Sequence, residues 1–511
     1  MTSKRVVLIA FVAALAVAAC SPSASVPSGS AGAPGFLPQA RSGQSKIQHV
    51  VIIVQENRSF DNFFDCFPGA DCVASAPPPN PQPSRGNLQS PCPGPVPTPT
   101  AGPTATPIQL TLNAKLPASD IDHSYCAAFV TDYDGGKMDG FYWSASLHYP
   151  SHIAQTYAYQ VVAKAQIQPY WDMARQYVLA DRTFPTQASG SFTAHQDLIR
   201  GDTVVATGQS VVDYPWNHYG VNNWGCDDPK NPPKGPSVTS LLTSTGYLAQ
   251  QGPFPCFTYA TARDLLDAKG ISWKYYVPTF PYDGGQMWNA FDAISAVRYD
   301  KSEWPNKNNF NCTQSCVSWP ETNVLCDIAG STASPCPKPN PSGSVSLPAV
   351  SWVIPDAQDS DHGGGSQPGP DNGPDWVASV VNAIGESSYW NSTAIVIVWD
   401  DWGGFYDHIP PPQLDYEGLG FRVPMIIVSP YAKRGYVSHT QYEFGSLLKF
   451  VEDTYSLGNL GTTDVRANSI SDSFNFNQPP HRFKPIKLLN ANHDRRFFLH
   501  RPPSNEPVDT E

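Results

Sequence analysis

Runs of consecutive apolar residues, rich in β-branched side chains, recur along the chain. A strand that is apolar at every position is typical of a parallel sheet, where both faces are covered. Such runs occupy residues 50–54, 392–399 and 423–428, with shorter ones at 272–277 and 351–354. Helices are predicted between them, at 167–179, 192–199, 376–384 and 444–455. The pattern predicts an α/β protein with a mostly parallel central sheet.

Two of these strands run directly into acidic residues. The first ends at Glu56-Asn57, and a second, far down the chain, ends at Asp400-Asp401. Ligands of open α/β sheets bind beyond the carboxyl ends of the strands, so these side chains stand where a site is expected. One acid after a strand is commonplace, but two such strands with adjacent carboxylates indicate a cation. Oxygen-rich ligands suit a hard or borderline divalent ion.

Several motifs resemble those of the bacterial phosphoesterase family, which includes non-specific phospholipases C and a group of acid phosphatases. They are Glu56–Asp61, Gly136–Phe141, Asp400–His408 and Pro410–Pro412. The resemblance runs from about residue 49 to about residue 455. It implies an alkaline-phosphatase-like α/β/α sandwich with disulfide-stapled loop insertions, a hydrolase of phosphate esters, and one divalent ion (Ca, Mg, Mn or Zn). The implied ligands are Glu56, Asn57, Asp400 and Asp401.

The superfamily chemistry implied by this resemblance uses a hydroxyl nucleophile at the start of a helix. Ser191 follows Gly190 and precedes a predicted helix, so it is the expected nucleophile. Thr186 and Ser189 remain rivals, and such hydroxyls can instead cap the helix. The phospholipase members carry Thr in a Gly-Pro-Thr-x-Pro-Asn-Arg setting that is absent here, and His195 stands where the Arg falls.

The resemblance also assigns roles to basic side chains. His123 and His362 are expected to contact the phosphate or donate a proton to the leaving oxygen, and Lys137, His195 and His408 are expected to bind substrate. Lys137 can instead pair with an acid, and His408 can simply fix its loop. Adjacent histidines found in acid phosphatase relatives are missing near 287–289, and Trp402 replaces a histidine and is expected to wall the pocket.

The N-terminus is typical of an exported protein. Lys4 and Arg5 precede an apolar run that ends at Cys20, as in a bacterial lipoprotein signal; the alternative is an ordinary signal peptide cut near Ala19. Residues 1–20 are therefore assigned to the signal, 21–45 to a flexible Ser/Gly/Pro tether, 46–460 to the catalytic domain and 461–511 to an extension packed on its surface. The formal charge of −12 over 511 residues argues against nucleic acid as a partner.

Ten further cysteines favour disulfides over a zinc cluster in such a compartment, although the Cys312-x3-Cys316 spacing resembles a metal motif. We expect pairing within 66/72/92/126 and within 312/316/326/336. Residues 74–107 are Pro-rich and predict a surface loop insertion stapled at Cys72 and Cys92.

Together these features predict an exported, envelope-anchored or secreted phosphoric ester hydrolase that works through a phosphoseryl intermediate. An acid-phosphatase-like phosphomonoesterase is the first expectation, because the phospholipase motif is missing. A phospholipase C acting on lipid phosphodiesters is the alternative, with membrane attachment through a lipidated Cys20. An inactive binding protein on the same scaffold is the third possibility, since several family histidines are absent.

Overall fold

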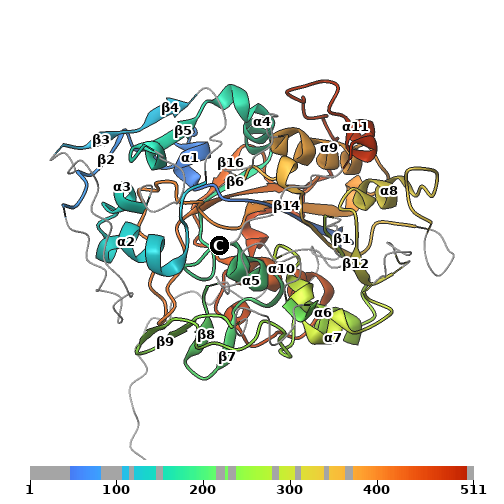
Figure 1. Cartoon of the computed structure of the whole chain (residues 1–511). Helices are drawn as coiled ribbons and strands as arrows, with labels where there is room; N and C mark the ends of the chain where they lie inside the picture. Colours follow the sequence, from blue (N-terminus) through green and yellow to red (C-terminus); the bar gives the residue numbers. More distant parts are fainter. Residues whose placement is uncertain are drawn as a thin grey trace, which may run out of the picture. The chain divides into compact units, whose positions relative to one another are not determined.

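A single mixed sheet of eight strands runs through the computed structural model of this chain (Figure 1). The structure describes residues 46–81, 106–113, 120–144, 154–213, 225–227, 238–278, 287–304, 312, 314–338, 345–362 and 372–502. Of the two units into which the chain divides, Met1–Gln39 and Ala40–Glu511, all of these belong to the second. The predicted signal peptide, Cys20, the tether and most of the Pro-rich insertion lie outside the described residues.

The sheet confirms the mostly parallel arrangement predicted from the apolar runs. Its strands, in spatial order, are β12 (Cys316–Ser318), β11 (Trp273–Tyr276), β13 (Val350–Val353), β1 (His49–Gln55), β14 (Thr393–Trp399), β15 (Val423–Val428), β6 (Val178–Thr183) and β16 (Tyr436–Ser438). Only β15 among them is antiparallel to its neighbours, β14 and β6. The other strands all point the same way, so their carboxyl ends meet at one edge.

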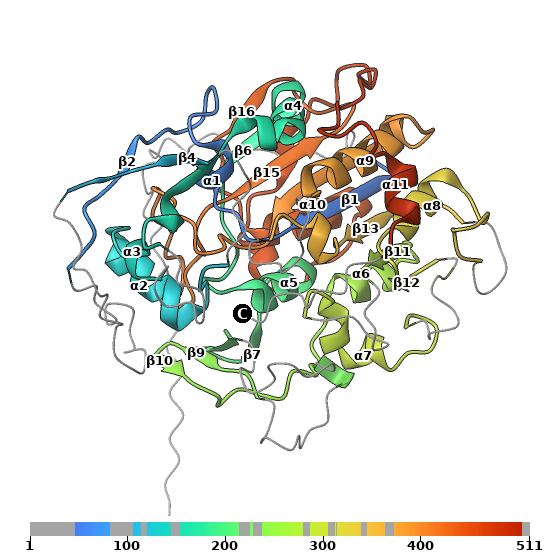
Figure 2. The same cartoon turned by 45° about the horizontal axis from the view of Figure 1, so that its top comes forward.

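Helices cover both faces of the sheet, which confirms the α/β/α layering (Figures 1 and 2). On one face lie α4 (Gln168–Gln176), α8 (Asn323–Ala329), α9 (Gly373–Gly385) and α11 (Arg495–His500); on the other lie α5 (Ser191–Arg200), α6 (Ala262–Ala268) and α10 (Phe444–Tyr455). Nearly every residue of α9 is buried, because α4, α8 and α11 cover the side turned away from the sheet. Within the described segments, no helix is both long and apolar enough to cross a membrane.

Smaller elements decorate the carboxyl edge of the sheet. They are α1 (Phe60–Phe64), α2 (Val130–Tyr133), α3 (Phe141–Ser144), α7 (Ser295–Arg298), the paired strands β2 (Ser75–Ala76) with β3 (Ile108–Gln109) and β4 (Thr111–Asn113) with β5 (Gln160–Val162), and a four-stranded sheet of β7 (Val204–Ala206), β8 (Gln209–Val211), β9 (Leu241–Thr243) and β10 (Gly246–Leu248). A second apolar cluster, separate from the main core, holds many of them together. Trp402, Phe405 and Phe421 from the loops after β14 belong to it.

Disulfides staple the loops, as predicted. The pairs are Cys66–Cys72, Cys226–Cys256, Cys312–Cys316 and Cys326–Cys336, and Cys126 is also disulfide-bonded. A Cys72–Cys92 staple across the Pro-rich insertion is wrong, because Cys72 is already bonded to Cys66, six residues before it. The ends of that insertion are instead joined by the backbone pairing of β2 with β3.

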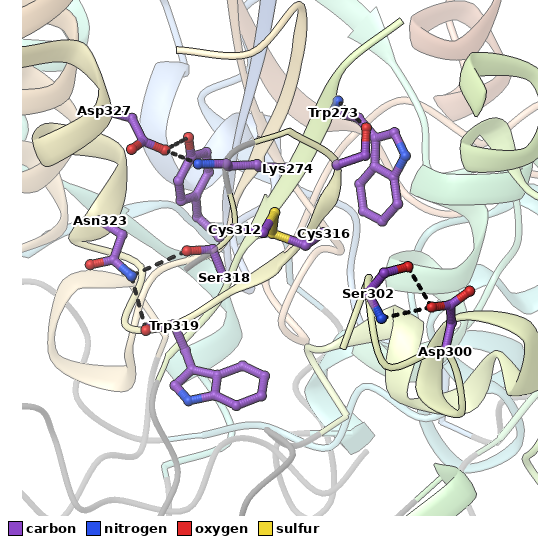
Figure 3. Close-up of a disulfide and its surroundings, with 12 residues drawn as sticks. Trp273, Lys274, Asp300, Ser302, Cys312, Cys316, Ser318, Trp319, Asn323 and Asp327 are labelled. Atoms are coloured by element: carbon purple, nitrogen blue, oxygen red, sulfur yellow. Dashed lines mark hydrogen bonds and ion pairs between the residues drawn. A yellow bond between two sulfur atoms is a disulfide. The ribbon is translucent and has the colours of Figure 1, made fainter. Parts of the chain in front are cut away.

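Two interactions stabilise the edge of the sheet around β12, a disulfide and a buried ion pair (Figure 3). The Cys312–Cys316 disulfide closes the loop that enters it, so its cysteine spacing does not belong to a metal site. Behind the strand, Lys274 Nζ lies 2.6 Å from Asp327 Oδ2, which also accepts a 2.7 Å hydrogen bond from the Tyr276 hydroxyl. This buried ion pair links β11 to α8.

Candidate active site

The carboxyl ends of β1 and β14 bring the predicted acidic residues together. Gln55 and Trp399 are paired in register, so the next residues of both strands lie side by side. The Asn57 amide donates a 2.9 Å hydrogen bond to Asp400 Oδ1, and the Arg58 amide donates a 3.0 Å bond to the Asp401 carbonyl. All of these side chains are buried. Two segments more than 340 residues apart in sequence therefore form one constellation.

The turns after the two strands adopt unusual backbone conformations. Asn57 has a φ of 60°, a left-handed conformation that is uncommon for residues other than glycine and that asparagine adopts more readily than most. Gly403, in the turn after β14, has a φ of 59°, and a Cβ there would collide with the carbonyl oxygen of Asn57. The Gly403 amide donates a 2.7 Å hydrogen bond to Asp401 Oδ1, which holds that carboxylate in place.

Helix α5 adds a hydroxyl and an imidazole to the acidic group. Ser191 is the first helical residue, and its Oγ lies 3.3 Å from Asp401 Oδ2 and 3.4 Å from Asn57 Oδ1. His195, one turn later, places Nε2 at 3.1 Å from Glu56 Oε1. The helix begins without a side-chain cap, so the positive end of its dipole is directed at the Ser191 hydroxyl.

Neither rival hydroxyl reaches this group among the described contacts. Thr186 Oγ1 accepts a 3.1 Å hydrogen bond from the Phe444 amide, at the start of α10. Ser189 Oγ donates to the carbonyl of Val212 at 3.2 Å. Both therefore have structural partners elsewhere, whereas Ser191 faces the acids.

The donor set fits a divalent cation. Ligand atoms of Glu56, His195 and Asp400 all lie within 4.8 Å of one another, and all three side chains are buried. Asp400 Oδ1 accepts two backbone amides, but Oδ2 is buried and has no hydrogen-bond partner in the described part of the chain. Burial raises the pKa of Asp400 well above its ordinary value, and the nearby Glu56 carboxylate raises it further. A cation bound between these oxygens would remove that penalty.

Aromatic rings form a wall around the group. His123 Nδ1 lies 2.6 Å from the Ile121 carbonyl, which leaves Nε2 facing Asn57 at 3.2 Å and Asp401 at 4.0 Å. Its ring is 6.4 Å from that of His362 and 6.2 Å from that of Trp402. Trp288 was not predicted as a site residue, although its ring lies 6.3 Å from that of His195 and 5.8 Å from that of His362. The sequence did point to this segment, because Trp288 lies where the adjacent histidines of the acid phosphatase relatives are absent.

The structure places the other two predicted substrate-binding residues apart from this group. Lys137 Nζ pairs with Asp134 Oδ2 at 2.9 Å, and its side chain is 58% exposed. His408 Nδ1 lies 2.7 Å from Asp61 Oδ2. Within the described part of the chain, neither Lys137 nor His408 contacts the group formed by Glu56 and Asp400.

His408 belongs to a second charged cluster, which already contains its own cation. Arg422 Nη2 donates to Asp61 Oδ1 at 2.8 Å and Arg422 Nε donates to Asp407 at 3.1 Å. These carboxylates and His408 have spacing compatible with a metal, but the guanidinium neutralises them. Burial raises the pKa of Asp407 to about 6, against the opposing charge of Arg422.

Acids, imidazoles and a helix-start serine are therefore gathered at the carboxyl edge of an α/β/α sheet. The model of the Phosphoesterase family matches residues 47–458. The chain therefore belongs to the Phosphoesterase family, and it is a hydrolase acting on phosphoester bonds. The resemblance inferred from the sequence motifs is confirmed.

Curated relatives are similar over most of this chain. Non-hemolytic phospholipase C of Pseudomonas aeruginosa is 23% identical, over 85% of this chain and 58% of its own length. Phospholipase C B of Mycobacterium tuberculosis is 24% identical, over 90% of this chain and 83% of its own. The chain thus spans little more than half of the first relative's length.

Solved structures with a similar arrangement include a protein in the alkaline phosphatase superfamily from Vibrio parahaemolyticus and a phosphonate monoester hydrolase from Silicibacter pomeroyi. The first is 11% identical with a TM-score of 0.32, and the match covers 60% of this chain and 65% of that one. The second is 12% identical with a TM-score of 0.27, covering 62% and 73%.

Proposed function

We propose that this protein hydrolyses small phosphate monoesters through a phosphoseryl intermediate on Ser191. The observation that carries the proposal is the position of Ser191 Oγ, at the positive end of α5 and 3.3 Å from Asp401 Oδ2. Glu56, Asn57, Asp400 and Asp401 would hold the divalent ion. Once bound, that ion supplies positive charge that lowers the pKa of the serine hydroxyl and offsets charge on the phosphoryl group.

The remaining steps are assigned to this chain's own groups. Ser191 Oγ attacks phosphorus while its proton passes to Asp401 Oδ2, 3.3 Å away, and the bond from phosphorus to the leaving oxygen breaks. The dipole of α5 stabilises the negative oxygens of the phosphoryl group. His123 or His362 donates a proton to the departing alkoxide, since both rings border the site. Water then cleaves the phosphoserine ester and regenerates the hydroxyl. The buried walls formed by Trp288 and Trp402 exclude bulk water from this space.

Replacing Ser191 by Ala is expected to abolish turnover of p-nitrophenyl phosphate, by at least about 10³-fold, while the divalent ion still binds. Activity and bound metal are measured on the same preparation. Ser189→Ala serves as the control and should retain turnover, because its hydroxyl contacts a carbonyl of another loop. Full activity in Ser191→Ala would refute the assignment.

A phospholipase C acting on lipid phosphodiesters is the second candidate, supported by the names of the relatives. Comparing p-nitrophenyl phosphate with p-nitrophenyl phosphorylcholine, with and without chelator, separates the two. We expect the monoester to turn over faster and the chelator to suppress both reactions, because the acids then lose the cation that they require. Faster cleavage of the diester would favour the phospholipase, and no turnover with any divalent metal would favour an inactive scaffold.

A further inference from the structure

His195 lies on the same face of α5 as Ser191. The two are four residues apart, which in a helix places them one turn from each other. Ser191 faces Asp401, and His195 faces the neighbouring pair, Glu56 and Asp400. One helix therefore presents both a hydroxyl and an imidazole to the ends of β1 and β14.

His195 Nε2 is close to one oxygen of each neighbouring acid, at 3.1 Å from Glu56 Oε1 and 3.8 Å from Asp400 Oδ2. Two donors bound at about 2.1 Å to the same metal at cis positions are separated by roughly 3 to 3.5 Å. The separation from Glu56 lies in this range, and the separation from Asp400 is slightly longer. Helix α5 sets the position of the ring, and the ring of Trp288 lies nearly parallel to it, at 13° with centroids 6.3 Å apart. The imidazole is thus placed before any ion arrives.

The carboxylates are oriented by backbone amides. Asp400 Oδ1 accepts hydrogen bonds from the amides of Asn57 and Asp401, and Asp401 Oδ1 accepts one from the amide of Gly403. The Asp400 oxygen beside His195 is Oδ2, 3.8 Å from Nε2. Calcium usually takes about six to eight oxygen ligands, whereas zinc is satisfied by about four donors that include imidazole nitrogen.

We propose that His195 is a metal ligand of this protein, bound through Nε2, and that it makes the site select an imidazole-accepting transition metal over calcium or magnesium. This inference rests on the proposed function for the presence of an ion in the site. It changes the role of His195 from substrate contact to metal selection. Glu56 and Asp400 contribute the oxygens beside it.

Metal binding, measured separately from turnover, tests the inference. The full-length protein is stripped with chelator and titrated calorimetrically with Zn²⁺ and with Ca²⁺, for wild type, His195→Gln and His195→Arg. Both variants are expected to lose at least about tenfold in Zn²⁺ affinity and to change little in Ca²⁺ affinity, as expected when a ligand that only zinc prefers is removed. His439→Gln is the matched control, because that ring is largely exposed and pairs with Asp181.

Zinc-edge X-ray absorption of the wild-type protein provides a second readout that needs no variant of His195. Imidazole scattering is expected in the wild type, and it should persist in His123→Gln. Absence of nitrogen scattering would overturn the proposal, even if His195→Gln failed to fold. Unchanged Zn²⁺ affinity in His195→Gln would overturn it too. The proposal would also be overturned if His195→Arg kept the wild-type affinity for Zn²⁺ while His195→Gln lost it, because that result would assign His195 a charge-balancing role.

Because these readouts report binding, they separate this inference from the proposed function. A protein that binds zinc through His195 but hydrolyses no phosphate ester would contradict the function only. A protein that hydrolyses phosphate esters with equal Zn²⁺ affinity in wild type and His195→Gln would contradict the ligand assignment only.

Discussion

Among single residues, the two charged clusters differ in how the charge of their buried carboxylates is compensated. Asp61 and Asp407 are buried and both pair with Arg422, a cation of the chain itself, and Asp61 also pairs with His408. Glu56 and Asp400 are also buried, but Arg58 beside them donates to the carbonyl of Asp361 instead. A buried carboxylate needs compensation. The first cluster therefore contains its own cation, and the second has the donor set of a cation site.

The ionisation of His408 is expected to make the free energy of unfolding depend on pH. Burial alone lowers its pKa, but the hydrogen bond and charge of Asp61 outweigh burial, so the folded pKa is raised above the ordinary value of 6.5. A raised pKa means that the folded state binds the proton more tightly. The stabilising contribution is thus fully present below about pH 6.5 and is lost as the pH rises through the folded pKa.

The contribution of His408 to stability is measured by chemical denaturation of the wild type and of His408→Gln across pH 5 to 9. We expect the stability difference between the two proteins to shrink as the pH rises. A difference that stays constant across the range would show that His408 does not carry the proton in the folded state. His500→Gln is the control, because that ring is exposed and contacts the carbonyl of Arg496.

At the scale of elements, the site depends on two turns that fit together. The left-handed conformation at Asn57 aims its amide nitrogen at Asp400, and the left-handed conformation at Gly403 lets the second turn approach it. Glycine is required at Gly403 for two reasons, its positive φ and the contact with the Asn57 carbonyl. The strand ends can therefore meet only with this pair of turns.

Gly403→Ala is expected to destabilise the protein by clearly more than about 1 kcal/mol and to reduce metal affinity, because the turn that carries Asp401 must move. Thermal unfolding and metal titration measure the two effects. Gly270→Ala is the control: its φ is 64°, but no atom lies within 4 Å of the added methyl. Gly270→Ala therefore reports only the cost of placing a side chain at positive φ. Equal effects of the two substitutions would contradict the idea that the clash with the Asn57 carbonyl adds to this cost at Gly403.

At the scale of the whole molecule, residues after 460 are part of the core and not only a surface wrapping. Phe498 of α11 is buried against Trp376 of α9, with ring centroids 5.2 Å apart. Arg501, just after α11, pairs with Asp356 at 2.6 Å and with Asp359. Those two acids lie in the segment between β13 and His362, so the C-terminal segment stabilises a loop that borders the site.

Replacing Arg501 by Ala is expected to cost about 3 kcal/mol or more, because it leaves buried acids without their cation. Glu321 belongs to the same cluster, and burial raises its pKa well above the ordinary value while Arg501 opposes that shift. Without Arg501 the folded state binds more protons, so its stability falls as pH rises, and the loss should be larger at pH 8 than at pH 5.

Urea denaturation at both pH values tests this, with Arg495→Ala as the control on the same helix, where the side chain is exposed. A loss equal to that of the control would mean that the ion pairs of Arg501 contribute nothing to stability.

The mostly parallel sheet and the acidic ends of β1 and β14 could be read from the amino-acid pattern alone. A continuous apolar run has a local signature, and the position of a polar residue relative to a strand end follows from counting along the chain. The α/β/α sandwich and the role of Ser191 came from the family resemblance, which implies a hydroxyl nucleophile at the start of a helix. The choice over Thr186 and Ser189 needed the contacts of all three.

Tertiary structure alone decided which distant groups share a space. His195 meets Glu56 and Asp400, His408 pairs with Asp61, Cys72 pairs with Cys66, and Trp288 stands between two histidines. The contacts between distant residues depend on the order of strands in the sheet and on the loops that pack above it. The Cys66–Cys72 disulfide joins residues six apart, and only the structure selects it among the pairings possible for the cysteines of that region. A side chain's role in a site is set by its neighbours in space, and those are fixed only when the chain has folded.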